Sequence, residues 1–402
     1  MSELRGLPDE ILVEILSKLP IKTLILCAST CKCLLSFITT PSFIVSHIQR
    51  VGHNNPFIFL KYYTHGINKH YFSLHPDDDS FNGDFCLIDM PVTYDCHVNN
   101  GCLLNVVGSC NGVICLSNAP CKCHYSNNIF LWNPSIRKSI LLPRANNVST
   151  DVWIGLGFGF DSLTNDFKVV RLVYYKCPVT LNFKGPGIVE VYSLRSNSWR
   201  VVESFMPKYQ IHELGFSQCF VRGALHWVGW SGSGKGVIVV FSVENELFGE
   251  IKMPLCSENG DSEHGVLMKV GKCGDKLALI RTISGSNIWS VWVMREYGKV
   301  ESWTATCNLD FPDRYPKPMA FGFRKSEEVV VFVTDETFSD RDRMHLMLLV
   351  SRSGVVIKVL GMVDARSSSL YMDTYFESLA LFTEGRPMFD NKFQGYNPLL
   401  LK

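Results

Sequence analysis

A change in the spacing of apolar residues near residue 55 constrains this chain more than any other feature of its sequence. In the first part of the chain, up to residue 50, apolar side chains recur at steps of three and four, which places them on one face of a helix. From about residue 55 the step becomes two, in short runs separated by Gly, Asn, Ser and Pro. The chain is therefore predicted to contain a small helical unit followed by one large β domain.

Four short helices are predicted before residue 51. Proline is tolerated in the first turn of a helix and ends a helix that precedes it, so the first helix begins near Pro8 and ends before Pro20. Ser29 or Thr30 is expected to cap a third helix, and Thr40-Pro41 to start a fourth. A bundle this small has too little core to be stable alone, so we expect it to pack against a partner or against the β domain.

A repeated pattern distinguishes among the β architectures. An apolar strand, a polar turn and a bulky apolar residue recur, with the turns at Ser135, Ser196, Asn245, Tyr297 and Ser353. Successive turns are roughly 50 to 60 residues apart, close to the roughly 40 to 50 residues of a propeller blade with its loops extended. The predicted fold is α+β in total: an N-terminal all-α bundle, then an all-β propeller-like domain of five or six blades.

A propeller requires its first and last strands to meet. We expect the late run at residues 378–382 to complete a blade begun by residues 57–60, 71–74 and 85–88, so that the ring leaves no open sheet edge. Deletion of residues 375–402 should then abolish the cooperative melting of the β domain.

Composition and charge argue against several classes of protein. Apolar residues make up 46% and charged residues 19% of the 402 residues, which is unlike a disordered chain. The net charge is +1, and beyond residue 50 there are 34 basic and 34 acidic side chains, so we expect no nucleic-acid partner.

The N-terminus and the hydropathy pattern predict the compartment. Residues 1–10 lack the basic start and apolar run of a signal peptide, and no run approaches the roughly 20 apolar residues of a membrane span. We expect no membrane partner and a cytoplasmic or nuclear location. The 15 cysteines would there stay reduced and pack as small apolar side chains.

Three segments suggest chemistry that their spacing does not support. Cys121-Lys-Cys-His124 lacks the paired spacing of a zinc site, and Ser231-Gly-Ser-Gly-Lys-Gly236 lacks the spacing of a phosphate-binding loop and its following helix. Asp77-Asp-Asp79 lacks further calcium ligands and is interpreted as a solvated loop. The histidines are scattered and no nucleophile elbow occurs, so we expect no catalytic residue, metal or cofactor.

The tryptophans of the β domain are expected to pack mainly between sheets. Because tryptophan is common at binding hot spots, one or two could instead contact a target at the rim of the propeller. Trp230, beside Ser231-Gly-Ser-Gly234, is the candidate substrate-binding residue.

The motifs at the N-terminus and in the β domain resemble those of a known family. Leu7-Pro-Asp-Glu-Ile-Leu-Val-Glu-Ile-Leu-Ser-Lys-Leu-Pro-Ile-Lys-Thr-Leu24 looks like an F-box of the plant kind, and Cys31-Lys32 and Pro41-Ser-Phe43 continue the same pattern. Gly108-Ser-Cys-Asn-Gly-Val-Ile-Cys-Leu116 and Leu131-Trp-Asn-Pro-Ser-Ile-Arg137, with residues 157–161 and 191–199, resemble the F-box-associated, kelch-like domain of the same proteins, a group that includes S-locus F-box proteins. The resemblance places an F-box at residues 1–50, the associated domain at 51–390 and a tail at 391–402.

The resemblance implies a function. Members of the family are substrate-recognition subunits of cullin-RING (SCF-type) ubiquitin ligases, in which the F-box binds a small adaptor of the S-phase-kinase-associated type and thereby the cullin, and the second domain holds the target protein. The positions that match the family's apolar adaptor-facing and core positions, and that are predicted to bind the adaptor, are Leu7, Pro8, Ile11, Leu12, Ile15, Leu16, Leu19, Pro20 and Ile21. The pattern departs from the family at residues 26–30 and at Leu34, where the family usually carries Arg-Phe with Arg-Cys-Val and Trp.

Two alternatives remain open from the sequence. One is a propeller interaction module that works without a ligase, and the other is a propeller that binds a glycan or a small molecule. Seven loops are candidates for binding the target: 92–102, 118–127, 144–151, 176–187, 205–215, 256–264 and 335–344.

Overall fold

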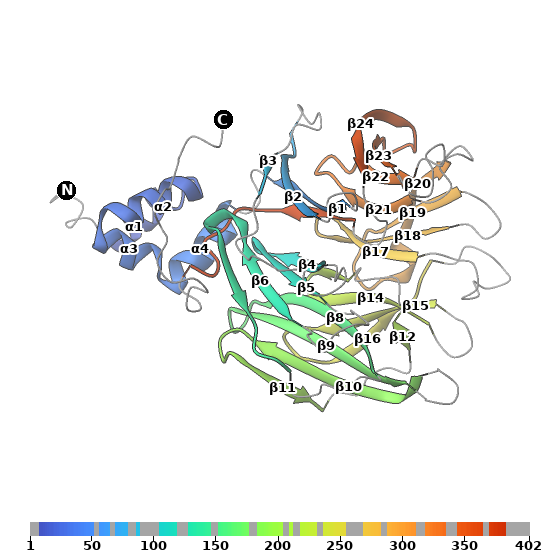
Figure 1. Ribbon diagram of the computed structural model, residues 1–402, viewed down its shortest axis with the longest axis horizontal. Helices are drawn as coiled ribbons and strands as arrows, with labels where there is room; N and C mark the ends of the chain where they lie inside the picture. Colours follow the sequence, from blue (N-terminus) through green and yellow to red (C-terminus); the bar gives the residue numbers. More distant parts are fainter. Residues whose placement is uncertain are drawn as a thin grey trace.

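The computed structural model contains four N-terminal helices and a six-bladed β-propeller (Figure 1). It describes residues 8–51, 56–64, 69–78, 86–88, 104–118, 128–145, 152–176, 183–203, 209–211, 218–230, 236–254, 268–282, 288–310, 318–334, 344–364 and 370–382. The helices are α1 (Asp9–Leu16), α2 (Ile21–Thr30), α3 (Lys32–Ile38) and α4 (Pro41–Val51). The structure confirms the helical bundle and fixes the number of blades at six.

Each blade is an antiparallel sheet that runs from an inner to an outer strand. Blade I contains β25 (Tyr371–Tyr375), β1 (Phe57–Thr64), β2 (Lys69–Pro76) and β3 (Cys86–Leu87). Blade II contains β4 (Asn105–Cys110), β5 (Val113–Ser117), β6 (Ile129–Asn133) and β7 (Lys138–Leu141). Blade III contains β8 (Val152–Asp161), β9 (Asp166–Lys176), β10 (Phe183–Ser193) and β11 (Ser198–Val202).

The other three blades follow the same order. In blade IV, β12 (Gln210–Ile211) and β13 (Cys219–Val221) both pair with β14 (Ala224–Trp230), which is followed by β15 (Gly236–Ser242) and β16 (Phe248–Ile251). Blade V contains β17 (Met268–Cys273), β18 (Lys276–Thr282), β19 (Ile288–Met294) and β20 (Trp303–Asp310). Blade VI contains β21 (Pro318–Phe323), β22 (Val329–Thr334), β23 (Met344–Val350) and β24 (Val356–Asp364). The five predicted turns all lie between the third and fourth strands of blades II to VI.

The ring closes through a different strand from the one predicted. Blade I does combine both ends of the β domain, but its inner strand is β25, which pairs with β1 so that Met372 lies opposite Leu60. The predicted run at residues 378–382 is not a strand. The pattern of apolar runs does not reveal β25, because Asp373 and Thr374 interrupt it.

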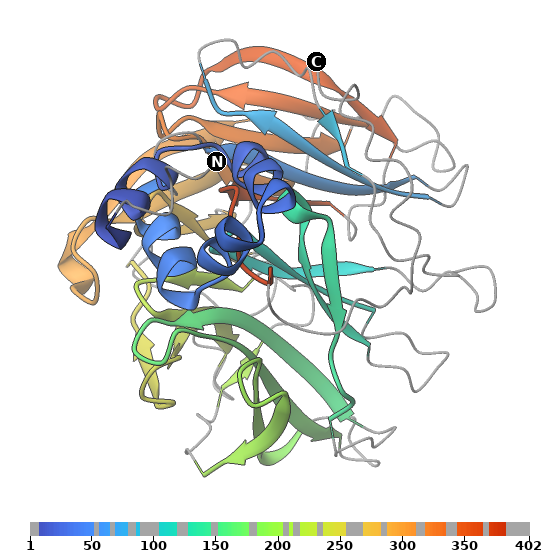
Figure 2. The same ribbon diagram turned by 90° about the vertical axis from the view of Figure 1, so that its left-hand side faces the viewer.

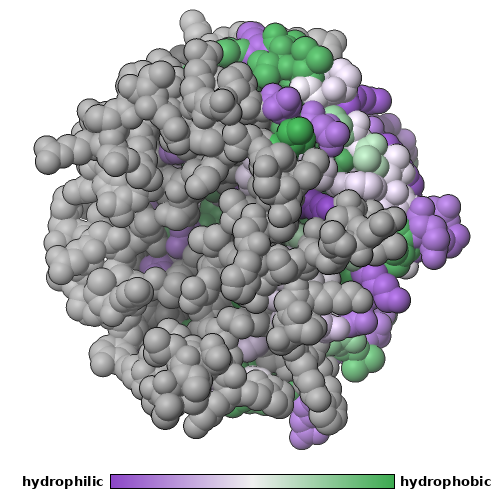
Figure 3. Space-filling view, turned by 90° about the vertical axis from the view of Figure 1, so that its right-hand side faces the viewer, coloured by the Kyte–Doolittle hydropathy of each residue, from purple (hydrophilic) through white to green (hydrophobic). Residues whose placement is uncertain are grey.

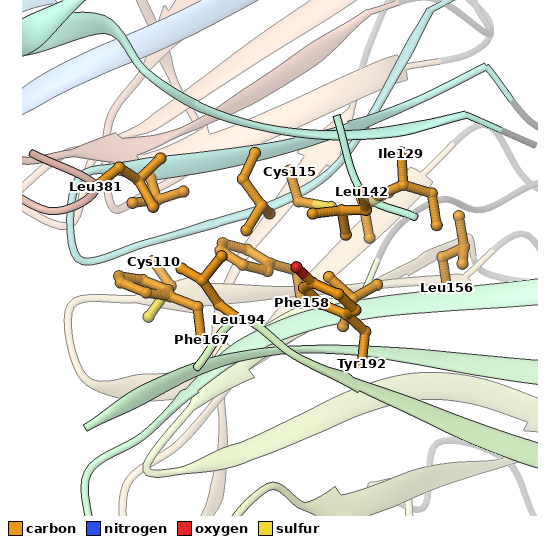
Figure 4. Packing of buried hydrophobic residues seen from close by; sticks show 14 of the residues in the cluster. Cys110, Cys115, Ile129, Leu142, Leu156, Phe158, Phe167, Tyr192, Leu194 and Leu381 are labelled. Carbon is orange, nitrogen blue, oxygen red and sulfur yellow. The ribbon is translucent and has the colours of Figure 1, made fainter. Parts of the chain in front are cut away.

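Residues 376–382, called here the C-terminal strap, connect the propeller to the helical bundle. The Asn133 side chain, fully buried, donates hydrogen bonds to the backbone oxygens of Ser378 (2.9 Å) and Ala380 (2.7 Å). Leu379 lies in the core of the bundle, whereas Leu381 lies in the core between blades II and III (Figure 4). The bundle therefore packs against the β domain, as its small size predicts.

Local signals predicted helix starts with mixed success. The Thr40 hydroxyl accepts a hydrogen bond from the backbone N–H of Phe43 at the start of α4, as expected. The prediction that Ser29 or Thr30 caps α3 is wrong, because both lie in the last turn of α2 and donate to its backbone oxygens. The N-cap of α3 is Cys31, which makes no side-chain capping bond.

The acidic segment at residue 77 is not a solvated loop in the part that the structure describes. The Asp77 side chain is buried, accepts a hydrogen bond from Arg324 Nε at 2.8 Å and a second from the backbone N–H of Lys325. Because Asp77 follows β2 and Arg324 follows β21, this ion pair joins blades I and VI beside the ring closure. Local spacing contains no sign of a partner 247 residues away.

The described cysteines of the propeller interior behave as the composition predicts. Cys110, Cys115, Cys219, Cys273 and Cys307 are buried and form no disulfide. Burial raises the pKa of the Cys273 and Cys307 thiols to about 11, which keeps them protonated and apolar in character.

Candidate functional site

The first candidate site is the exposed face of helix α1. Ile11 and Ile15 are one helical turn apart, so their side chains share a face, and they are 44% and 48% exposed. Large apolar side chains are costly to leave in water, and a pair of them on a small helical unit is typical of an interface.

The nine residues predicted to bind an adaptor divide between this surface and the core. Pro8, Ile11, Ile15 and Pro20 are exposed, and Leu19 is half-buried. Leu12, Leu16 and Ile21 are buried within the bundle, where they stabilise the helices and cannot touch a partner directly. Leu7 lies outside the described residues. The motif therefore combines contact positions with core positions.

Two further exposed residues were not singled out from the sequence as contacts. Leu26 on α2 is 53% exposed and Leu35 on α3 is 39% exposed. Leu26 lies in the segment that departs from the family pattern, so only its exposure in the folded bundle identifies it as surface.

The expectation that Trp230 is exposed at a rim is wrong. Trp230 ends β14 and is only 2% exposed, packed in a core cluster with Val228, Ile238 and Met294. Gly236, the residue opposite it on β15, leaves room for the indole, because an added Cβ there would lie 3.1 Å from the Trp230 ring. Trp230 is thus a core residue of blade IV.

The second candidate site is a cavity at the end of the propeller that faces the helices. Figure 2 views the molecule from the side of the helices, which lie in front of this end. It has a volume of about 560 Å³. Its wall combines α4, through Val45 and Ile48, with the start of the C-terminal strap and the turns between the first two strands of blades II to V. The sequence motifs contain no signal for this cavity, since segments from opposite ends of the chain form its walls.

A polar cluster centred on Asp373 lies at the wall of this cavity. The Asp373 carboxylate accepts hydrogen bonds from Ser109 Oγ on β4 (2.7 Å) and from Tyr371 Oη (3.1 Å), and pairs with Lys272 Nζ on β17 at 3.1 Å. Burial lowers the pKa of Lys272, but its interactions with Asp373 and with the nearby Cys219 and Cys110 together outweigh burial and raise it. The cluster holds the inner strands of blades I, II and V together, and it uses both carboxylate oxygens of Asp373.

The third candidate site is the opposite end of the propeller. Because the turns between first and second strands lie beside the cavity, the antiparallel order puts the far ends of the second strands at the end away from the helices (Figure 1). The described strand ends that flank the seven predicted target loops lie there, although the loops themselves are mostly outside the described residues. Figure 3 views this end, and its coloured flank carries apolar and polar patches side by side.

The described residues offer no metal site and no membrane span. No group of three or more His, Cys, Asp or Glu side chains among them could hold a metal ion, and no described helix is both long and apolar enough to cross a membrane. Residues 121–124, with the Cys-Lys-Cys-His motif, lie outside the described part of the chain, as do residues 391–402.

Comparisons with known proteins match both parts of the chain. A model of the F-box domain matches residues 4–46, and a model of the F-box associated beta propeller domain matches residues 89–381. The F-box protein CPR1 of Arabidopsis thaliana is 28% identical over 344 residues, which cover 80% of this chain and 78% of that protein. The F-box protein At4g22390 of the same species is 26% identical over 364 residues, covering 86% of this chain and 81% of that one.

A third relative matches a shorter stretch. The F-box/kelch-repeat protein At3g23880 of Arabidopsis thaliana is 27% identical over 216 residues, which cover 53% of this chain and 55% of that protein. Both family models agree with the four helices and six blades of the structure. The chain therefore belongs to the family of F-box proteins that carry an F-box associated beta propeller domain.

Proposed function

We propose that this protein is the substrate-recognition subunit of an SCF-type cullin-RING ubiquitin ligase. In this proposal the helical bundle binds the adaptor, the adaptor connects to the cullin, and the propeller holds the protein to be ubiquitinated. The observation that carries the proposal is the exposed pair Ile11 and Ile15 on the helix whose sequence matches the F-box motif.

The position of the bundle relative to the propeller supports the proposal. The helices cover one end of the propeller, and the strand ends that flank the candidate target loops lie at the other end (Figure 1). A target held there would stay accessible while the adaptor occupied α1. The contribution of such a subunit is proximity, because holding the target near a ubiquitin-loaded enzyme raises the effective concentration of its lysines. The protein itself would then need no catalytic residue.

The test is co-purification of the adaptor with wild-type protein and with Ile11→Lys/Ile15→Lys. Burying a side chain of this size contributes about 1.5 to 3 kcal/mol, so loss of both, with two charges added, should weaken adaptor binding by about 100-fold or more. The matched control is Leu163→Lys/Leu247→Lys, because these side chains are 73% and 61% exposed but lie on the propeller. Circular dichroism of the helices verifies that each variant is folded.

The outcomes distinguish three cases. Loss of the adaptor from the α1 variant alone supports the receptor function. Equal retention by wild type and the α1 variant refutes the proposed binding face. Absence of the adaptor from folded wild type favours an interaction module that works without a ligase.

A further inference from the structure

The cavity between α4 and the propeller has the size of a small-molecule site. Its volume of about 560 Å³ lies within the roughly 300 to 1,000 Å³ range of ligand pockets in proteins. Phe160, Phe220 and Phe376 contribute aromatic surface to its wall, and Val45 and Ile48 contribute aliphatic surface. An apolar body of a few rings or methylene groups would therefore lose water on entering it.

The charged groups of the cavity wall differ in whether the protein itself neutralises them. Lys272 is paired with Asp373 at 3.1 Å, and Arg222 is paired with Asp275 at 2.6 Å. Glu377, which precedes Ser378 in the C-terminal strap, makes no hydrogen bond or ion pair with any described residue. The cation that acts on it is Lys22, an exposed residue of α2 beyond ion-pair distance.

The environment of Glu377 indicates an unmet need for a positive partner. The side chain is partly buried at the cavity wall, and this burial raises the pKa of its carboxyl, with only the influence of Lys22 opposing it. A desolvated carboxylate without a paired cation is costly, so a cationic group brought into the cavity would gain a charge-assisted hydrogen bond with reduced competition from water.

We propose that this cavity binds a small organic cation, with its apolar body against the phenylalanines and its amine on the Glu377 carboxylate. The proposal is independent of adaptor binding, because the cavity lies on the inner side of α4 and not on the exposed face of α1. Because the wall includes α4, the strap and blades II to V, an occupant would hold the bundle and the ring closure together and stabilise both.

The probe is 2-phenylethylamine, tested by calorimetric titration and by thermal melting of the full chain. Phenylacetate has the same ring and nearly the same length with a negative charge, and 2-phenylethanol has the same ring without charge. The amine is expected to bind with a Kd below about 1 mM, an affinity within the range for a ligand of this size. Its binding should also raise the melting temperature of the protein. Phenylacetate should bind at least about tenfold more weakly.

Two variants assign the binding to the cavity. Glu377→Gln should weaken the amine by about tenfold or more, the loss expected for a charge-assisted hydrogen bond, while leaving 2-phenylethanol unchanged. Val45→Trp, at the α4 part of the wall, should weaken the binding of all three compounds by narrowing the cavity. Glu301→Gln is the control, since Glu301 is exposed on the propeller and is not part of the cavity wall.

The outcomes either support or overturn the proposal. Preference for the amine that is lost in Glu377→Gln and kept in Glu301→Gln supports it. No binding of the amine to folded wild type, equal binding of amine and phenylacetate, or unchanged amine binding by a folded Glu377→Gln variant overturns it.

Discussion

Leu379 is the fully buried residue that the C-terminal strap contributes to the core of the helical bundle, and its replacement by alanine tests how the bundle and the propeller depend on each other. The side chain is fully buried in one cluster with Leu24, Ile38 and Phe43, although it comes from the far end of the chain. A leucine-to-alanine change at a buried site costs about 2 to 5 kcal/mol. Few other contacts can compensate, because the bundle has a small core of its own.

Urea unfolding followed by two signals separates the bundle from the propeller. The eight tryptophans all lie after residue 131, so their fluorescence reports on the propeller alone, whereas circular dichroism at a helical wavelength includes the bundle. For so small a unit m is about 1 kcal/mol/M, so the helical transition of Leu379→Ala should move down by about 2 M urea or more. The fluorescence transition should move much less.

The control replaces an exposed leucine of the propeller. Leu163→Ala, at a 73% exposed position, should shift neither transition by more than the equivalent of about 0.5 kcal/mol. An unchanged helical transition in Leu379→Ala, or equal shifts of both signals, would refute the reasoning, because either result means that Leu379 is not what stabilises the bundle.

Three further predictions concern the ring closure and the buried polar groups. Gly112→Ala and Gly223→Ala start from the same φ of +75°, but a Cβ at Gly112 would lie 2.7 Å from the Phe376 oxygen while one at Gly223 meets nothing within 4 Å. Both variants should lose about 1 kcal/mol of stability to backbone strain, and Gly112→Ala should lose about 1 to 3 kcal/mol more to the clash. The difference between their free energies of unfolding measures the clash, and equal losses of stability would contradict the packing of the C-terminal strap. Asp77→Ala should cost about 1 to 3 kcal/mol, because it removes the buried carboxylate that accepts from Arg324 Nε and from the Lys325 N–H while Arg324 keeps its ion pair with Glu328. Asp275→Ala, in the exposed pair with Arg222, should cost less than about 1 kcal/mol. Similar unfolding midpoints for the two variants would count against the ion pair that joins blades I and VI. Burial lowers the pKa of His226 from 6.5 to about 4, so protonation of this histidine favours the unfolded chain. It contributes about 3 kcal/mol of stability, which is fully present above pH 6.5 and is lost as the pH falls towards 4. The free energy of unfolding of His226→Gln should therefore fall less steeply than that of wild type between pH 7 and 4. If stability falls equally with pH in both proteins, His226 does not cause the loss.

The boundary between helices and strands could be predicted because it depends on local spacing. The step of three and four before residue 51 and the step of two afterwards reflect which side of each element is buried, and every residue needed to read them is close in sequence. The same holds for the hairpins at Asn245 and Tyr297, and for the first turn of α4 at Thr40. The F-box motif could likewise be found, because its contact and core positions lie on one short stretch of chain.

Prediction failed where the partner of a residue lies far along the chain. Trp230 stands beside a glycine-rich segment that suggests exposure, but it lies in one buried cluster with Met294 of blade V. Asp77 resembles a solvated acid until Arg324 reaches it from blade VI. The prediction that Ser29 or Thr30 caps α3 failed for a different reason, because both hydroxyls donate to backbone oxygens within α2 instead.

The sequence by itself determined the helical bundle, the repeated blades and the family, since each depends on patterns confined to a short stretch of chain. Only the tertiary structure decided which strand closes the ring, which of the nine motif residues are exposed, and that a cavity with Glu377 at its wall lies beside α4. These features arise where segments from opposite ends of the chain meet, and burial and charge pairing at such meetings depend on the packed arrangement rather than on local order along the chain.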